Sequence, residues 1–318
     1  MDEFALIRQH FAKAIVNDDV ALGIGDDCAL LIPPPNKYLA VSMDTLVAGT
    51  HFPEGMAAKH IATRALATAL SDLAAMGAEA LWFSLALTIP KADEQWVAEF
   101  CDGLLNFADT HNCALVGGDI TRGPLTVSVQ VHGAVAPNAA LKRSGAKPDD
   151  IIYVTGSLGD GAAALAVLQQ KFTVRRSSQD YLQQRFYRPT PRLQEGQLLA
   201  GTASAAVDIS DGLHADLGHI CDASGVGAMV NVNRLPMSEH WRSSVSLDKA
   251  LDWAVSGGDD YELCFTVPRE KISTVEEWIR QGRLKATAIG KITASTGIFM
   301  VNNGKTLEFD VEGYKHFD

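Results

Sequence analysis

The 318-residue sequence lacks the features that mark membrane, secreted and nucleic-acid-binding proteins. No apolar run approaches the roughly 20 residues that cross a bilayer. No basic segment followed by an apolar stretch begins the chain, so we expect no signal peptide. Lys and Arg number 27 against 38 Asp and Glu, a net charge of −11. This balance argues against nucleic acid or an anionic membrane as the main partner.

Cysteine is scarce and never occurs as a Cys-x-x-Cys pair, which argues against a zinc site. The five positions are far apart and mostly lie among apolar residues: Cys28, Cys101, Cys113, Cys221 and Cys264. An odd number of isolated thiols is typical of a protein in a reducing compartment. We therefore expect a cytoplasmic protein.

The common nucleotide-binding and nucleophile motifs are also missing. The chain has no P-loop, no kinase-type His-Arg-Asp loop and no Gly-x-Ser-x-Gly elbow. Gly156-Ser-Leu-Gly-Asp-Gly161 superficially resembles a nucleotide-binding turn but lacks the Lys-Ser/Thr of a P-loop, so both a ligand contact and an ordinary loop stay open. A kinase with this sequence would hold its nucleotide by metal ions and backbone amides. Gly117-Gly118 and the helix start Ser210-Asp211-Gly212 could supply such amides.

The sequence contains enough apolar material for two domains, since 47% of the residues are hydrophobic. Residues 136–150 are rich in turn-forming residues, and we place the domain boundary there, giving domains 1–137 and 138–318. Strands and helices mix without strict alternation in both halves, which predicts an α+β fold. Hydrophobic periodicity predicts helices over 3–15, 57–76 and 93–109, and strands over 81–89, 113–116 and 125–135.

Aspartates beside Gly, Ser or Thr recur at the expected ends of these elements. They are Asp26, Asp27, Asp44, Asp72, Asp119, Asp208, Asp211, Asp259 and Asp260. Each alone could be a solvated turn. Should Asp27, Asp44, Asp72, Asp119, Asp208 and Asp211 converge, their mutual repulsion would require several divalent cations, because Mg²⁺ prefers carboxylate oxygens. Such a site suits a polyphosphate, whose oxygens complete the coordination of the metals.

Seven segments together resemble the thiamine-monophosphate kinase family, from about Phe4 to Tyr314. They are Gly23-Ile-Gly-Asp-Asp-Cys-Ala29, Asp44-Thr-Leu-Val-Ala-Gly-Thr-His-Phe52, Leu70-Ser-Asp-Leu-Ala-Ala-Met-Gly77, Gly117-Gly-Asp-Ile-Thr-Arg-Gly123, Arg143-Ser-Gly-Ala-Lys-Pro148, Asp208-Ile-Ser-Asp-Gly-Leu213 and Ser256-Gly-Gly-Asp-Asp-Tyr-Glu-Leu263. The resemblance implies transfer of the ATP γ-phosphate to thiamine monophosphate. It also implies the two-domain α+β fold of aminoimidazole ribonucleotide synthetase and selenophosphate synthetase, with the N-terminal domains pairing into a homodimer through a shared β-barrel.

The same resemblance implies roles for individual residues. Mg²⁺ would be held by Asp27, Asp44, Asp72, Asp119, Asp208 and Asp211, assisted by Ser42 and the Met43 backbone. ATP would contact Gly118, Asp119, Arg143 and Ser210, and thiamine monophosphate would contact His51, Asp259 and Tyr314. We expect Asp44, Asp119 and Arg143 to contribute most to catalysis. The family usually has Glu where this chain has Asp259, so that contact involves a side chain one methylene shorter.

This chemistry requires no general base, because a phosphomonoester with a second pKa of about 6 is already an anion near pH 7. Other interpretations stay open: a ring-closing synthetase of the same superfamily, or a non-catalytic protein that binds divalent metal. A selenophosphate synthetase would need a reactive cysteine in its N-terminal loop, and no cysteine precedes Cys28. Three of these residues could also have no role in ligand binding: His51 could be an ordinary loop histidine, Tyr314 a core aromatic and Arg143 a solvated cation.

Overall fold

The computed structural model describes residues 6–14 and 17–307, and the chain divides into two compact units. The first unit comprises Met1–Leu73 and Ala78–Asn138, and the second comprises Ala74–Gly77 and Ala139–Asp318. The change of unit after Asn138 falls inside the turn-rich segment 136–150. Each unit mixes strands and helices, which confirms the predicted α+β class. Within the described ranges, no helix is long and apolar enough to cross a membrane.

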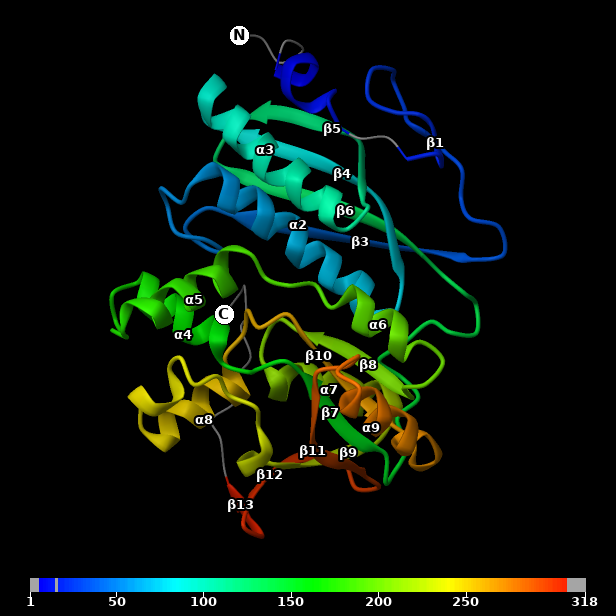
Figure 1. The fold of residues 1–318 in the computed structure, drawn as a ribbon, viewed down its shortest axis with the longest axis vertical. Helices are drawn as coiled ribbons and strands as arrows, with labels where there is room; N and C mark the ends of the chain where they lie inside the picture. The colour runs from blue at the N-terminus through cyan, green and yellow to red at the C-terminus, as the bar shows by residue number, and fades with distance from the viewer. Residues whose placement is uncertain (1–5, 15–16, 308–318) are drawn as a thin grey trace. The chain divides into compact units, whose positions relative to one another are not determined.

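A four-stranded sheet forms the centre of the first unit, in the order β3 (Tyr38–Val47), β6 (Thr126–Val135), β4 (Glu79–Ile89) and β5 (Ala114–Arg122). Neighbours are antiparallel except β4 and β5, which are parallel. Helices α2 (Ala58–Ala75) and α3 (Glu94–Thr110) lie against the sheet (Figure 1). Both helices and β6 follow the predicted ranges to within one or two residues.

Strand β3 lies at the edge of this sheet and has two different faces. Leu39, Val41 and Met43 are 46%, 54% and 59% exposed, whereas the alternating positions Ser42 and Asp44 are partly buried. Because side chains alternate along a strand, the exposed apolar residues lie on the face opposite Ser42 and Asp44. The edge strand therefore carries a polar face and an apolar face.

Two predictions for the first unit are wrong. The helix expected over 3–15 is, in its described part, a short π-helix, η1 (Ile7–Phe11), followed by the small hairpin β1 (Val20–Leu22) and β2 (Leu30–Leu31). The strand expected to end at Val116 instead continues through Gly117-Gly118-Asp119 to Arg122. Gly118 allows this, because a Cβ there would lie 1.9 Å from the carbonyl oxygen of Leu85 on β4. The glycine lets the two strands stay paired.

The second unit is built on a seven-stranded sheet in the order β13-β12-β9-β11-β7-β10-β8. Its strands are β7 (Ile151–Thr155), β8 (Ala205–Ile209), β9 (Gly227–Asn231), β10 (Glu262–Val267), β11 (Ala286–Thr293), β12 (Gly297–Asn302) and β13 (Lys305–Leu307). All neighbours are antiparallel except β9 and β12. Strands β8 and β10 are buried along their whole length, so both faces of the sheet are covered there.

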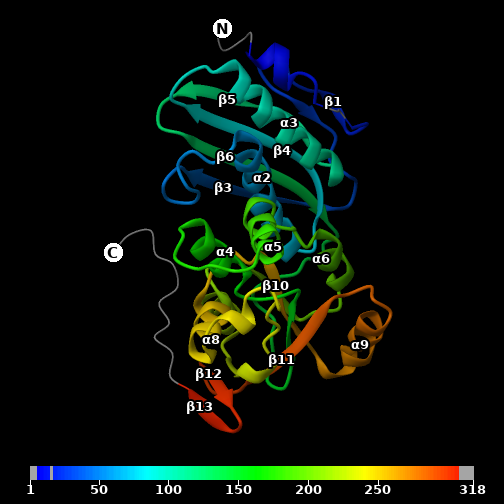
Figure 2. The ribbon, with the colours of Figure 1, turned by 60° about the vertical axis from the view of Figure 1, so that its left-hand side comes forward.

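Six α-helices surround this sheet in the described chain: α4 (Asp160–Leu168), α5 (Arg176–Tyr187), α6 (Leu193–Leu199), α7 (Leu213–Ser224), α8 (Leu247–Ser256) and α9 (Ile272–Arg280). Helices α4 and α5 lie side by side in both views (Figure 2). Strand β8 leads into α7, and α8 leads into β10, so the loops that follow β8 and precede β10 adjoin across one strand pairing. These two loops carry the aspartate motifs of the second unit.

Candidate functional site

In the first unit, Ser42 and Asp44 from β3 face Asp72 on α2. The Ser42 hydroxyl donates to Asp72 Oδ2 at 2.5 Å. Burial, together with the negative charge of Asp72, raises the pKa of Asp44 to about 6, and a hydrogen bond from Thr68 partly offsets this rise. Two neighbouring carboxylates and a hydroxyl are a donor set that fits Mg²⁺, because a cation would remove the repulsion between the two charges.

The remaining metal candidates of this unit are exposed. Asp27 lies in the turn between β1 and β2, where its backbone N–H donates to the Asp26 carboxylate at 2.8 Å. Asp119 lies on β5 opposite Ala86, and the Met43 side chain is on the apolar face of β3. Within residues 6–14 and 17–307, no three His, Cys, Asp or Glu side chains are grouped closely enough to hold a metal ion. The full metal cluster therefore stays a prediction.

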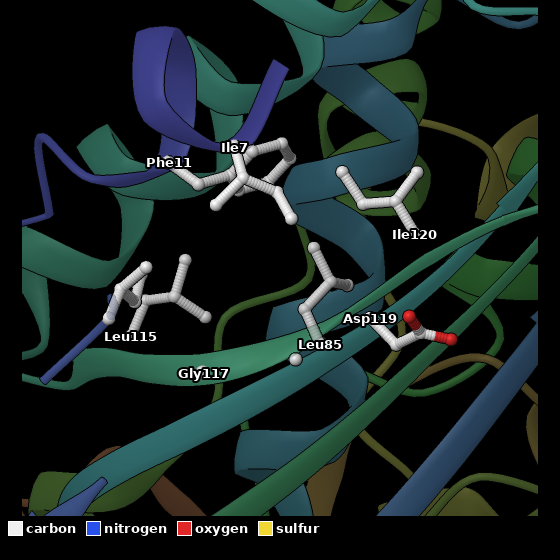
Figure 3. Close-up of a pocket in the computed structure, with 9 residues that line it drawn as sticks. Ile7, Phe11, Leu85, Leu115, Gly117, Asp119 and Ile120 are labelled. Atoms are coloured by element: carbon white, nitrogen blue, oxygen red, sulfur yellow. The ribbon is translucent and has the colours of Figure 1, made fainter. Parts of the chain in front are cut away.

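A small apolar pocket of about 50 Å³ adjoins Gly118 and Asp119. Its walls combine η1, β4 and β5, with lining residues that include Ile7, Phe11, Leu85, Leu115 and Ile120 (Figure 3). The carboxylate of Asp119 lies at the edge of this apolar group and points away from it. The pocket thus presents an apolar surface beside a carboxylate.

His51 follows β3 in a loop and folds back on that strand. Its Nδ1 accepts a hydrogen bond from the Val47 N–H at 3.0 Å. A ring nitrogen that accepts cannot carry a proton, so the neutral ring carries its proton on Nε2. His51 would therefore meet a ligand as a hydrogen-bond donor at Nε2.

In the second unit, Asp208 is buried at the end of β8, and Ser210 and Asp211 follow in the loop before α7. The Ser210 and Asp211 amides both donate to Oδ2 of Asp216, at 3.1 Å each. The expectation that these two amides are available to a nucleotide is therefore wrong. Burial raises the pKa of Asp216 to about 7, although these backbone donors lower it.

The loop before β10 carries Asp259, and the sequence did not reveal how that loop is held. Asp260 is 1% exposed, and its two carboxylate oxygens accept from the Gly159 and Gly161 amides at 2.7 and 2.9 Å. The nucleotide-like turn Gly156–Gly161 thus binds a carboxylate of its own chain. Asp259 itself is partly exposed, with the Tyr261 hydroxyl 3.1 Å from its Oδ1.

A buried ion-pair network beneath this loop was also not anticipated. Glu262 is fully buried and accepts from both Arg185 and Arg192. Arg185 also donates to the carbonyl oxygen of Asp260 at 3.0 Å. Long-range pairs of this kind leave no spacing pattern in a sequence, so no local signal could have indicated them.

Arg143 and Tyr314 are the two remaining residues for which we predicted a role. Arg143 is exposed in the segment before β7, where its carbonyl oxygen accepts from the Ser224 hydroxyl at 3.3 Å. Tyr314 lies outside the described residues.

Two family models match the chain: AIR synthase related protein, N-terminal domain, over residues 25–135, and AIR synthase related protein, C-terminal domain, over residues 147–302. The thiamine-monophosphate kinase of Salmonella typhimurium is 49% identical over 99% of this chain and 98% of its own, and that of Escherichia coli K12 is 46% identical over the same shares. Among solved structures, the thiamine-monophosphate kinase of Stenotrophomonas maltophilia has a TM-score of 0.88 at 44% identity, covering 96% of this chain and 98% of that one. AaThiL complexed with AMPPCP and TMP has a TM-score of 0.79 at 28% identity, covering 99% and 96%.

Proposed function

The chain belongs to the thiamine-monophosphate kinase family, and we propose that it transfers the γ-phosphate of ATP directly to thiamine monophosphate, with Mg²⁺ held by aspartates. Relatives with this name cover almost the whole chain, and the similar AaThiL structure is a complex with AMPPCP and TMP. The observation that carries the metal part of the proposal is the group Ser42, Asp44 and Asp72, whose two acidic side chains repel each other.

The proposed metal ligands extend this group. Asp27, Asp119, Asp208 and Asp211 join Asp44 and Asp72, with Ser42 and the Met43 backbone assisting. Bound Mg²⁺ would neutralise charge on the phosphates of ATP and on the transferring group. The chain's own contribution is made within each unit: Asp44 lies on a strand and Asp72 on a helix of the first unit, and Asp208 lies at a buried strand end of the second.

For ATP we propose Gly118, Asp119, Arg143 and Ser210, with the purine base in the apolar pocket beside Gly118. The pocket would supply apolar walls for the ring. Asp119 lies at the margin of the pocket and would bind the metal ions that accompany the phosphates. Arg143 is exposed and always charged, so it can meet the phosphates without first breaking a buried ion pair. Ser210 would act through its hydroxyl, since its amide donates to Asp216.

For thiamine monophosphate we propose His51, Asp259 and Tyr314. His51 would donate from Nε2, because its Nδ1 accepts from Val47. The Asp259 carboxylate could accept from the aminopyrimidine, directly or through a water, and an aromatic side chain could stack on a ring. The acceptor phosphate is itself the nucleophile, so the reaction needs positioning and charge neutralisation but no proton abstraction.

We also propose a cytoplasmic homodimer. Leu39, Val41 and Met43 present an apolar face on an edge strand, a position that proteins commonly cover by pairing with another chain. All five cysteines are free thiols, four of them buried, which suits a reducing compartment.

The deciding experiment measures ADP release from ATP and Mg²⁺ with and without thiamine monophosphate, with thiamine diphosphate identified by chromatography. We expect stoichiometric ADP and thiamine diphosphate only when all three components are present. A ring-closing synthetase would release ADP with a different acceptor, and a metal-binding protein would release none. Either result would refute the proposed function.

A further inference from the structure

The loop between α8 and β10 has an unusual backbone at the two residues that flank Asp260. Asp259 has φ +68° and Tyr261 has φ +51°, which places two non-glycine residues in the sparsely populated left-handed region. Such conformations persist only where the surroundings impose them, and they gather at functional sites. The contacts of this loop therefore impose its backbone conformation.

Five hydrogen bonds hold the loop in this conformation. The Gly159 and Gly161 amides donate to the Asp260 carboxylate, and Arg185 donates to the backbone carbonyl oxygen of Asp260. On either side, the Asp259 N–H donates to the Ser210 carbonyl oxygen at 2.9 Å and the Tyr261 N–H to that of Ile209 at 2.8 Å. The backbone around Asp259 is thus fixed at both ends.

The result of this arrangement is that the side chains of Asp259 and Tyr261 meet. The Tyr261 hydroxyl donates to Asp259 Oδ1 at 3.1 Å, and both residues are partly exposed. The hydroxyl of Tyr261 therefore sets the direction of the Asp259 carboxylate, at a place where both side chains are accessible from solvent.

We propose that Tyr261 is a positioning residue, which fixes the Asp259 carboxylate in the orientation that binds the acceptor, while Asp260 fixes the backbone beneath both. This inference rests on the proposed function, in which Asp259 contacts thiamine monophosphate. Tyr261 acts through Asp259 and makes no contact of its own with the acceptor. The Asp259 side chain is one methylene shorter than Glu and has less reach. A donor on the same chain that fixes its direction reduces the conformational entropy that the side chain loses on binding.

Tyr261→Phe tests this directly, since it removes only the hydroxyl. We expect the KM for thiamine monophosphate to rise about three- to tenfold, the effect of one ordinary hydrogen bond. We expect kcat to stay within about twofold, because a contact that stabilises the ground state and the transition state equally affects only KM. The KM for ATP should also stay within about twofold, because Asp259 is assigned to the acceptor. Tyr153→Phe is the matched control: it removes a hydroxyl that donates to Glu276 in the same unit at 2.7 Å, and it leaves the acceptor KM unchanged.

A double-mutant cycle separates positioning from direct contact. In an Asp259→Ala background, Tyr261→Phe should cause no further rise in the acceptor KM. An equal rise in both backgrounds would show that Tyr261 contacts the acceptor itself and would overturn the inference, as would an unchanged KM in the folded single variant. If the wild-type protein does not phosphorylate thiamine monophosphate at all, the proposed function fails and this inference fails with it. Melting curves of each variant confirm that the comparison is between folded proteins.

Discussion

Arg192 and Glu262 form a bidentate ion pair in which Nε and Nη2 of the guanidinium each lie 2.6 Å from a carboxylate oxygen. Glu262 is fully buried on β10 and also accepts from Arg185, so one carboxylate serves two cations. The pair supports the strand that directly follows the Asp259 loop. The contribution of this ion pair to the free energy of unfolding can be measured separately from catalysis.

Glu262→Gln should lower the free energy of unfolding of the second unit by about 3 kcal/mol or more, because removing one partner leaves buried charge uncompensated. Urea denaturation followed by circular dichroism measures this. Glu277→Gln on α9 is the control, since Glu277 pairs with Arg280 at the surface and such pairs contribute about 1 kcal/mol or less. Equal losses in the two variants would contradict a special role for the buried network.

Asp44→Asn and Asp119→Asn should each lower kcat at least about 100-fold at saturating ATP and modest Mg²⁺, because each removes a proposed metal ligand. A second readout needs no substrate: in EDTA, Asp44→Asn should melt at a higher temperature than the wild type, since it relieves repulsion with Asp72. The exposed Asp102→Asn on α3 serves as control. Near-normal turnover in both variants would contradict the metal cluster.

Incubation with γ-labelled ATP and Mg²⁺, without acceptor, should leave the protein unlabelled. The acceptor phosphate is already an anionic nucleophile near pH 7, so no enzyme-bound phosphate is needed. Acid-quenched protein is counted after gel filtration. Stoichiometric label that passes into thiamine diphosphate on adding the acceptor would instead establish a phosphoenzyme.

Asp259→Ala should raise the KM for thiamine monophosphate and leave the affinity for ATP almost unchanged, because Asp259 is assigned to the acceptor alone. Steady-state kinetics gives the first quantity and calorimetry the second, on the same samples. Asp252→Ala, which removes an exposed carboxylate on neighbouring α8, is the control. A collapse of ATP affinity with an unchanged acceptor KM would assign Asp259 to the nucleotide.

The contribution of His132 to stability should fall in mild acid, whereas the raised pKa values of Asp44 and Asp216 act in the opposite direction. His132 lies on β6 opposite Val41 of β3 and Trp82 of β4, and its partial burial lowers its pKa. Around and below the unfolded-state pKa of about 6.5, His132 binds more protons in the unfolded chain than in the folded chain, so its contribution to stability decreases as pH falls through that window. The difference in melting temperature between His132→Gln and the wild type should move in favour of the variant as pH falls from about 7.5 to about 5. The exposed His219→Gln should show no such change.

Long, strongly periodic elements could be predicted from the sequence, and elements shaped by a neighbour could not. Helix α3 and strand β6 follow their hydrophobic pattern, since each buries one consistent face. Strand β5 does not end at its glycines, because its pairing with β4 outweighs the usual meaning of a Gly-Gly step. Local composition contains no information about that partner.

The candidate site shows the same limit. The aspartates could be named as candidate ligands from their motifs, and the structure brings Asp44 close enough to Asp72 for their charges to interact. The role of Asp260 could not be deduced, because its partner Gly159 lies 101 positions away in the chain. Two adjacent aspartates thus differ in their surroundings: Asp259 is partly exposed and Asp260 is buried.

The amides of Gly159 and Gly161 both donate to a carboxylate on the same chain, that of Asp260. A tethered ligand has an effective concentration set by the fold, far above that of a free anion in solution, and it binds without losing translational freedom. Added phosphate should therefore not displace Asp260, and a titration with phosphate should detect no binding at this turn. A glycine-rich turn at a helix start can thus serve as an intramolecular contact that positions a neighbouring loop, without binding a ligand.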